Sequence, residues 1–209
     1  MTDAIERTLI VGPGSPNGTR ADAAAAARRL GERIAAEGLA DIDYAPVDSP
    51  FGTLYAATTR RGLVRLAFPE ESLDEFLQRL AHRLSPRILA APAALDPVKR
   101  ELEEYFAGSR RRFDLPLDWS LITPFAKRVL RKTAAIPYGG HLSYAEVATE
   151  AGSPRGARAA GNALGSNPIP IVIPCHRVLH SGGGLGGYGG GLERKRYLLE
   201  LEGALTPRM

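Results

Sequence analysis

The sequence predicts an α+β chain in which a small α/β domain comes first and a mainly helical domain follows. Two patterns support this prediction. Strand-like and helix-like segments alternate between residues 51 and 108, and two short helical segments flank a glycine-containing turn near residue 152. A length of 209 residues, with 44% hydrophobic and 24% charged residues, allows two small domains with real cores.

Three parts are expected along the chain. Residues 1–40 form an N-terminal extension, in which a flexible start precedes an Ala-rich helix over 21–38. Residues 41–117 form the α/β domain, and residues 118–209 form the second domain. A proline-containing stretch over 110–120 links the two domains.

The α/β domain has clear strand and helix signals. Residues 51–68 predict two strands joined by a turn that contains Gly62. Apolar residues at positions 73, 76, 77, 80 and 84 have helical spacing, and a second helix follows over 95–108 and ends at Gly108. The acidic residues of this domain fall on helix faces or in loops, so paired-carboxylate chemistry is not expected here.

Capping signals define the helices of the second domain. Thr123 precedes Pro124, which predicts a helix that starts there and ends near residue 134. Ser143 and Glu146 have capping-box spacing and open a short helix that ends near residue 151. Ser153 and the proline after it are expected to start the next helix, which closes near residue 165. Two short helices joined by a tight turn have the outline of a helix-turn-helix.

The helix expected over 155–165 is smooth, because Ala and Gly fill most of its positions. Arg155 and Arg158 project near its start, where arginines suit contacts with phosphate. Charge is also uneven: residues 118–209 carry 11 basic and 6 acidic residues, or +5, whereas residues 1–117 carry 16 and 17, or −1. These features favour a nucleic-acid partner, while a buried helix and ordinary solvation by arginine remain as alternatives.

Cysteine usage limits the classes of protein that fit. Cys175 is the only cysteine and the chain has four histidines, so a disulfide framework and a Cys-rich zinc site are excluded. The first apolar patch is too short for a signal peptide, and no apolar run has the length of a membrane span. A free thiol without a secretion signal predicts a cytoplasmic protein. The same counts and the missing apolar run predict that the protein uses no metal and contacts no membrane.

The segment around the cysteine has the character of a reactive site. Residues 169–173 are apolar and β-branched, and they predict a buried strand that ends at the proline before Cys175. A lone cysteine is often a small buried hydrophobe, but the flanking proline, histidine and arginine favour a reactive thiol. Because neighbours in an extended chain point to opposite sides, His176 is expected to reach the thiol through a water. An acid must orient the imidazole, and the C-terminal helix offers Glu200 and Glu202.

The glycine-rich stretch after the cysteine has two interpretations. Gly184, Gly186 and Gly189 match the spacing of a dinucleotide-binding loop, but only 20 residues follow, too few for a second strand. No Lys-Ser/Thr pair follows to make a phosphate-binding loop. The glycines are therefore expected to form a close-fitting wall around Tyr188.

Several motifs occur in a fixed order: TPF, IPYG, SYAEVA and ARAAGNALGSNP, then PCHRV around Cys175 and the glycine loop with Tyr188. In this order they resemble the 6-O-alkylguanine-DNA alkyltransferase family, the methylated-DNA–protein-cysteine methyltransferases. The resemblance is specific from about Thr123 to Gly203, is looser over 51–117, and leaves out residues 1–40. It implies a ribonuclease-H-like first domain and a winged helix-turn-helix-like second domain.

The resemblance implies DNA repair by direct reversal, in which Cys175 accepts the alkyl group of 6-O-alkylguanine, and of 4-O-alkylthymine, irreversibly and once. His176, through a water, and Glu202 resemble the relay that takes the thiol proton. Asn167 resembles the hinge between the DNA-reading helix and the cysteine segment. Tyr144 resembles the residue that crowds the target phosphate and donates to the departing guanine. No second thiol is present to remove the alkyl group, and no cofactor is implied.

The implied partner is double-stranded DNA that contains alkylated guanine, bound by a monomer through the minor groove. Arg158 resembles the residue that fills the base stack after the nucleotide flips out, and a smooth helix suits the narrow groove. The implied DNA contacts are Ser143, Tyr144, Ser153, Arg155, Ala157 and Arg158, and the implied substrate pocket is Leu164, Pro170, Val178, Tyr188 and Gly189.

Other functions remain open at this stage. A protein that senses alkylated bases without repairing them would share the DNA-binding helices, but relatives that only bind lack the cysteine. A Cys-His hydrolase would show turnover, and a transcription regulator would need a cysteine cluster that residues 1–40 lack. Two residues depart from the family, in which Ser and Trp are common: Gly189, which is expected to widen or loosen the pocket, and Leu130, which is expected to affect packing only.

Overall fold

The computed structural model describes residues 25, 26, 29 and 38–206. Residues 40–206 belong to one compact unit. The predicted N-terminal extension, with its helix over 21–38, lies almost entirely outside the described residues. The three-part division of the chain stays a prediction.

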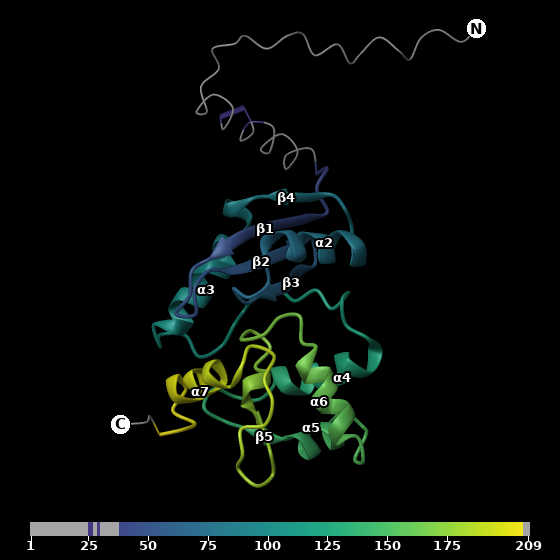
Figure 1. The fold of residues 1–209 in the computed structure, drawn as a ribbon, viewed down its shortest axis with the longest axis vertical. Helices are drawn as coiled ribbons and strands as arrows, with labels where there is room; N and C mark the ends of the chain where they lie inside the picture. Colours follow the sequence, from purple (N-terminus) through teal and green to yellow (C-terminus); the bar gives the residue numbers. More distant parts are fainter. Residues whose placement is uncertain (1–24, 27–28, 30–37, 207–209) are drawn as a thin grey trace, which may run out of the picture. The chain divides into compact units, whose positions relative to one another are not determined.

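The first half of this unit is built on a four-stranded sheet with the order β3-β2-β1-β4 (Figure 1). Three strands form an antiparallel meander, and β4 pairs parallel with β1. The strands are β1 (Ile42–Val47), β2 (Leu54–Thr59), β3 (Gly62–Ala67) and β4 (Ile88–Ala90). The two strands predicted over 51–68 are confirmed, whereas β1 and β4 were not predicted.

Two helices pack on this sheet, as predicted. Helix α2 (Leu73–Arg83) begins with a capping box: the Ser72 side chain accepts from the N–H of Glu75, and the Glu75 carboxylate accepts from the N–H of Ser72. Helix α3 (Asp96–Phe106) follows a short 3-10 turn, η1 (Pro92–Leu95). Residues Phe76 and Leu80 of α2 form a small core with one face of the sheet. The other face of the sheet packs into a larger apolar core, which also contains residues of the second half.

The edge strand β3 is covered by chain from the second half and from the link between the halves. The N–H of Leu63 donates to the carbonyl of Pro116 at 2.8 Å, and the N–H of Leu66 donates to the carbonyl of Pro168 at 2.8 Å. Gly62 has a φ of +121°, and a Cβ there would lie 2.1 Å from the Pro116 carbonyl oxygen, so only glycine fits. The sheet edge is thereby closed to other partners.

The second half is mainly helical. Its elements are α4 (Pro124–Ala134), β5 (Leu142–Ser143), α5 (Tyr144–Glu150), α6 (Ala157–Gly165), η2 (Cys175–Arg177), β6 (Val178–Leu179) and α7 (Leu192–Leu201), with β5 and β6 paired in parallel. The capping box that opens α5 at Ser143 is confirmed. Helix α6 starts later than predicted. The N–H of Gly156 donates to the carbonyl of Ser153 at 2.8 Å and closes a turn first, so Gly156 takes the N-cap position.

The strand predicted just before the cysteine is wrong, although the segment is buried as expected. Residues 169–173 form a tight turn in which the N–H of Ile173 donates to the carbonyl of Ile169 at 2.9 Å. Prolines stand before, inside and after this segment, and each removes a donor that a strand ladder would need. Ile171 has a φ of +73°, a strained conformation for a β-branched residue. Cys175 then begins the 3-10 helix η2.

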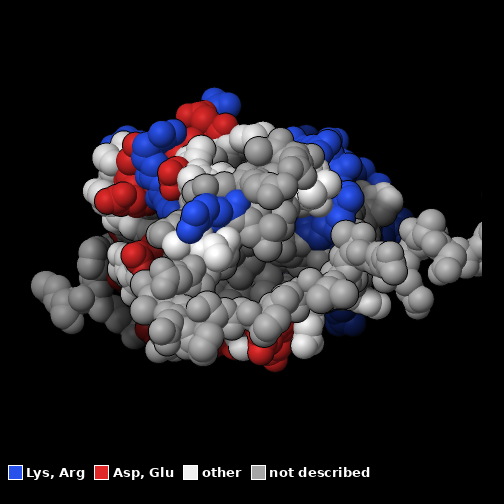
Figure 2. Space-filling view, turned by 90° about the horizontal axis from the view of Figure 1, so that it is seen from above, with Lys and Arg blue, Asp and Glu red and all other residues white. Residues whose placement is uncertain are grey.

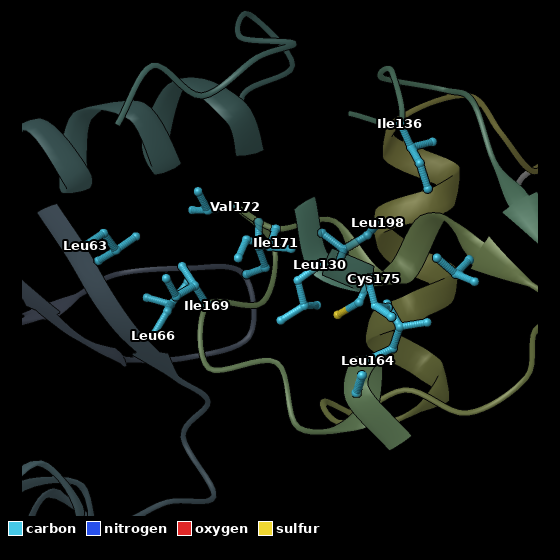
Figure 3. Packing of buried hydrophobic residues seen from close by; sticks show 14 of the residues in the cluster. Leu63, Leu66, Leu130, Ile136, Leu164, Ile169, Ile171, Val172, Cys175 and Leu198 are labelled. Carbon is cyan, nitrogen blue, oxygen red and sulfur yellow. The ribbon is translucent and has the colours of Figure 1, made fainter. Parts of the chain in front are cut away.

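One apolar core runs from the sheet through the 169–173 turn into the helices. Figure 3 shows Leu63 and Leu66 of β3 on one side of this turn and the helical residues Leu130 and Leu198 on the other, with the sulfur of Cys175 among them. The packing around the thiol therefore includes residues of both halves. Because protein interiors are close-packed, a change of volume in either half is felt at the thiol.

Arg155 and Arg158 differ from the ion-paired arginines of the structure. On the face shown in Figure 2, Lys and Arg side chains gather in patches, and Asp and Glu side chains lie among those on one side. Arginines of the first half such as Arg65, Arg79 and Arg87 are paired with carboxylates. Among the described residues, no ion pair involves Arg155 or Arg158, which are both exposed.

Within the part of the chain that the structure describes, no helix combines the length and the apolar character that a bilayer crossing requires. Among the same residues, no cluster of three or more His, Cys, Asp or Glu side chains is arranged so that it could hold a metal ion.

Candidate active site

The thiol of Cys175 is held in place by an amide. Only 6% of Cys175 is exposed, and its Sγ accepts a hydrogen bond from Asn167 Nδ2 at 3.1 Å. The same amide nitrogen donates to the carbonyl of Ile173 at 2.9 Å, and Asn167 Oδ1 accepts from the N–H of Ile169 at 3.0 Å. Asn167 is therefore fixed between the end of α6 and the cysteine segment, at the position that the resemblance gives to a hinge.

The thiol is protonated at neutral pH. Burial raises the pKa of Cys175 to about 11, against the opposing effects of the Asn167 hydrogen bond and the charge of Lys195. Because the thiolate is the nucleophilic form, a reaction at Cys175 requires a base that removes this proton.

A buried imidazole lies next to the cysteine in the chain. His176 is fully buried, and its Nε2 lies 2.9 Å from Glu202 Oε1. Burial alone would raise the pKa of Glu202, but hydrogen bonds from His176 and Arg177 outweigh it and hold the pKa at about 2. Burial lowers the pKa of His176, so the ring is neutral at pH 7. Of the two acids that the sequence offered, the structure therefore selects Glu202; Glu200 lies 3.6 Å from Arg196.

The ionised carboxylate decides which ring nitrogen carries the proton. A carboxylate only accepts hydrogen bonds, so the neutral His176 ring must carry its proton on Nε2 and keep a lone pair on Nδ1. Nδ1 is buried, and it has no hydrogen-bond partner among the described residues. No hydrogen bond joins His176 to the sulfur of Cys175 in this part of the chain, and the bridging water stays a prediction. The imidazole can accept one proton at Nδ1.

Two residues that were not among the predicted site residues complete the surroundings of Glu202. Arg177 donates from Nε to Oε2 at 2.8 Å and from Nη2 to Oε1 at 2.9 Å. Tyr105, from α3 of the first half, donates to Oε1 at 2.6 Å. Arg177 stands inside the PCHR motif and could have been suspected, whereas nothing in the sequence links Tyr105 to a site 97 residues away.

A cavity of about 630 Å³ opens beside the thiol. Among the predicted site residues, it is lined by Tyr144, Ala157, Arg158, Leu164, Cys175, Tyr188 and Gly189. Pro170 lines a second cavity of about 220 Å³, which Cys175 also borders. Val178 is fully buried and lines neither, and Ser143, Ser153 and Arg155 are also absent from both linings. Glycines 161, 165 and 187 line the larger cavity and were not predicted.

A buried lysine organises the glycine-rich loop. Lys195 is fully buried, and its ammonium donates to the carbonyls of Val178 at 2.6 Å, of Gly187 at 3.3 Å and of Leu185. Burial lowers its pKa to about 8. Tyr144 Oη donates to the same Gly187 carbonyl at 3.2 Å. The sequence offered no reason to select Lys195. It is one of several basic residues in a charged helix, and such residues are usually exposed to solvent.

The glycines of this loop allow close packing around two tyrosines. A Cβ at Gly190 would lie 2.8 Å from the Tyr188 ring and 2.5 Å from the Phe68 ring. A Cβ at Gly186 would lie 2.7 Å from Tyr144 Oη, and its φ of +67° also favours glycine. The loop therefore packs closely against Tyr188 at Gly190 and against Tyr144 at Gly186, and the wall of glycines around Tyr188 stays a prediction.

Helix α6 presents its two sides to different surroundings. Ala160 and Ala163 are buried against the core, which agrees with the packing interpretation of its small residues. Ala157 and Gly161 line the larger cavity, and Arg158 stands at the same cavity while remaining exposed. The helix thus has a packed side and an open side, and its open side borders the thiol.

Known proteins share both halves of this architecture. The ribonuclease-like domain of 6-O-methylguanine DNA methyltransferase matches residues 42–119, and the DNA binding domain of the same protein matches residues 124–204. A methylated-DNA–protein-cysteine methyltransferase of Mycobacterium tuberculosis is 40% identical over 166 residues, which cover 79% of this chain and 95% of the relative. The constitutive enzyme of Bacillus subtilis is 37% identical over 163 residues, which cover 76% and 94%.

Solved structures agree with the sequence matches. The crystal structure of Mycobacterium tuberculosis OGT in complex with DNA superposes with a TM-score of 0.66 at 42% identity, covering 77% of this chain and 92% of that one. The O6-methylguanine-DNA methyltransferase of Pyrococcus kodakaraensis superposes with a TM-score of 0.54 at 26% identity, covering 78% and 99%. The fold is that of a ribonuclease-like domain followed by a DNA-binding domain, as predicted. The chain belongs to the 6-O-methylguanine DNA methyltransferase family.

Proposed function

We propose that this chain repairs DNA by transferring the alkyl group of 6-O-alkylguanine to Cys175, as a methylated-DNA–protein-cysteine methyltransferase. The observation that carries the proposal is the placement of the sole thiol. Cys175 borders a cavity large enough for a base, and next to it in the chain lies a neutral imidazole whose Nδ1 can accept a proton. A DNA-binding relative of the same family, 42% identical, supports DNA as the partner.

The proposed DNA contact is made by a monomer through the minor groove, with α6 as the reading helix. Its open side is smooth, which suits a narrow groove, and it carries Arg158 at the mouth of the cavity. An alkylated base inside a duplex cannot be attacked in place, so the nucleotide must be flipped into the cavity. Arg158 is exposed and has no ion-pair partner among the described residues. Its side chain is therefore available to fill the gap that the flipped nucleotide leaves in the base stack.

The proposed transfer is a single displacement in which atoms and protons balance. The thiol proton passes through a bridging water to Nδ1 of His176, which Glu202 holds through Nε2. The sulfur then attacks the alkyl carbon, an S–C bond forms, and the C–O6 bond breaks with its electron pair going to guanine. Tyr144, whose hydroxyl lies at the cavity, gives a proton to the departing guanine and regains one from water, while His176 releases the thiol proton to water, so the net result is one proton moved from sulfur to guanine. The product is a thioether and unmodified guanine, so no cofactor or co-reactant is required.

Larger alkyl groups and a second base fit the same proposal. The cavity of about 220 Å³ borders Cys175 on the side of Pro170, and an alkyl group longer than methyl would have to extend into it. Gly189 stands between the two cavities and adds no side chain there. The proposal includes 4-O-alkylthymine as a second substrate, as the family resemblance implies.

The direct test is intact-mass analysis after incubation with duplex DNA that carries one 6-O-methylguanine. One equivalent of duplex should add 14 mass units (about one methylene) to one equivalent of protein, and peptide mapping should place the group on Cys175. The Cys175→Ser protein should bind the duplex but remain unmodified. Binding without modification of the wild type would indicate a sensor, and repeated turnover would indicate a hydrolase.

A further inference from the structure

The first half of the chain takes part in the active site through one hydroxyl group. Tyr105, on α3, donates from Oη to Glu202 Oε1 at 2.6 Å, and that same oxygen faces Nε2 of His176 at 2.9 Å. We infer that Tyr105 is a positioning residue of the proton relay, which places and polarises Glu202 for His176. This inference rests on the proposed function, since it assigns a role within that same reaction.

The Tyr105 ring is fixed by its neighbours. Tyr105 is completely buried, and its ring lies 5.5 Å from that of Phe106, 5.1 Å from that of Phe113 and 6.2 Å from that of Tyr138. Aromatic pairs at such centroid distances pack favourably in tilted and edge-on arrangements. The hydroxyl is thus aimed at Glu202 by aromatic rings from α3, from the linking segment and from Tyr138 of the second half, none of which belongs to the relay.

Tyr105 can only be the donor in this hydrogen bond. Burial, with the nearby negative charge of Glu202, raises the pKa of Tyr105 far above the range in which proteins work. Glu202 is ionised and has no proton to give. A short bond from a hydroxyl to a carboxylate is charge-assisted, and such bonds are stronger than neutral ones. Tyr105 therefore withdraws negative charge from the oxygen that His176 contacts.

The charge on that oxygen sets the proton affinity of His176. If Tyr105 no longer donates, Oε1 becomes more negative and stabilises an imidazolium, so His176 holds a second proton up to a higher pH. A doubly protonated ring has no lone pair for the thiol proton. The other titratable or charged groups around the pair stay in place: Cys175 and Arg177 on η2, Tyr138 ahead of β5, Tyr188 in the glycine loop and Lys195 on α7.

The experiment compares single-turnover transfer rates between pH 5 and pH 9 for the wild type and Tyr105→Phe, using duplex DNA with a labelled 6-O-methylguanine. Because a larger share of His176 is then doubly protonated, the rate on the acidic limb should be about three-fold to ten-fold lower than in the wild type. The acidic limb of the profile should move upward by roughly half a pH unit to one pH unit. A role in folding alone would lower the melting temperature without moving this limb.

Tyr138→Phe is the matched control. Tyr138 lies in the same aromatic cluster, but its hydroxyl donates to the carbonyl of Leu201 at 2.9 Å and not to Glu202. This variant should keep the wild-type acidic limb. A limb that moves equally in both variants would overturn the inference, because the effect would then belong to the cluster and not to the Tyr105 hydroxyl.

A second replacement guards against a variant that fails to fold. Site-specific 3-fluorotyrosine at position 105 keeps the ring and gives a more acidic hydroxyl, which donates more strongly. The acidic limb should then move to lower pH, opposite to Tyr105→Phe. An unchanged limb with fluorotyrosine refutes the positioning role, while absence of alkyl transfer in the wild type itself refutes the proposed function instead.

Discussion

Glu202 is the residue whose removal should have the largest effect on stability around the active site. Its side chain is fully buried and accepts hydrogen bonds from Tyr105, His176 and Arg177, with a longer bond from the N–H of Gly139 at 3.3 Å. Glu202→Gln keeps the shape and removes the charge. It leaves the guanidinium of Arg177, only 7% exposed, without a carboxylate.

Two routes give the size of the effect. Removing one partner of a buried ion pair typically costs about 3–5 kcal/mol. The pKa of Glu202 falls from an ordinary value of 4.5 to about 2 in the folded state, and at about 1.4 kcal/mol per pKa unit this corresponds to roughly 3 kcal/mol. For a chain of this length, about 3 kcal/mol lowers the melting temperature by roughly 6–12 °C.

The sign of the pH dependence follows from the lowered pKa. A carboxyl with a depressed folded-state pKa stabilises the fold fully above its unfolded value of 4.5, and this stabilisation is lost as the pH falls toward 2. Urea unfolding of wild type and Glu202→Gln should therefore differ by about 3 kcal/mol at pH 7 and converge on acidification. Glu200→Gln, two positions earlier and 3.6 Å from Arg196, should cost less than about 1 kcal/mol. Parallel stability curves from pH 7 to pH 3 would refute the reasoning.

Three further predictions concern the cavity. Arg158→Ala should slow repair of duplex DNA strongly while reaction with free 6-O-benzylguanine base stays near normal, as single-turnover rates would show; equal losses on both substrates would exclude a role in base flipping. Lys195→Met should free the carbonyls of Val178 and Gly187, so limited proteolysis should cut the loop over 181–190 faster than in Arg196→Met, a variant of the next residue on α7; equal cutting rates would contradict this. Methylation of Cys175 should lower the melting temperature by roughly 2–12 °C, because an added methyl crowds a thiol that is 6% exposed and 3.1 Å from Asn167 Nδ2; an unchanged melt would mean that the cavities accommodate the adduct freely.

The sequence alone predicted those elements whose cause is local. The hairpin over 51–68, helices α2 to α5 and the capping box at Ser143 depend on spacing, turn residues and caps within a few positions. The family resemblance then placed Cys175, His176 and Glu202 in one site, and the structure brings the imidazole and the carboxylate to 2.9 Å. The sequence-based prediction failed where other constraints outweigh the strand propensity of β-branched residues. The β-branched run before Cys175 is no strand, because its prolines lack the N–H groups that a ladder requires.

The tertiary structure alone decided which distant groups meet the relay. Tyr105 lies 97 residues from Glu202 along the chain, and no periodicity or motif connects a buried tyrosine on α3 with a carboxylate after α7. In the sequence, Lys195 is likewise one of many basic residues. Only the folded structure shows that it is buried and donates to three carbonyls. Burial and hydrogen-bond partners are properties of the packed chain. They set the pKa of Cys175 to about 11 and that of Glu202 to about 2, and so determine where the protons of this site reside.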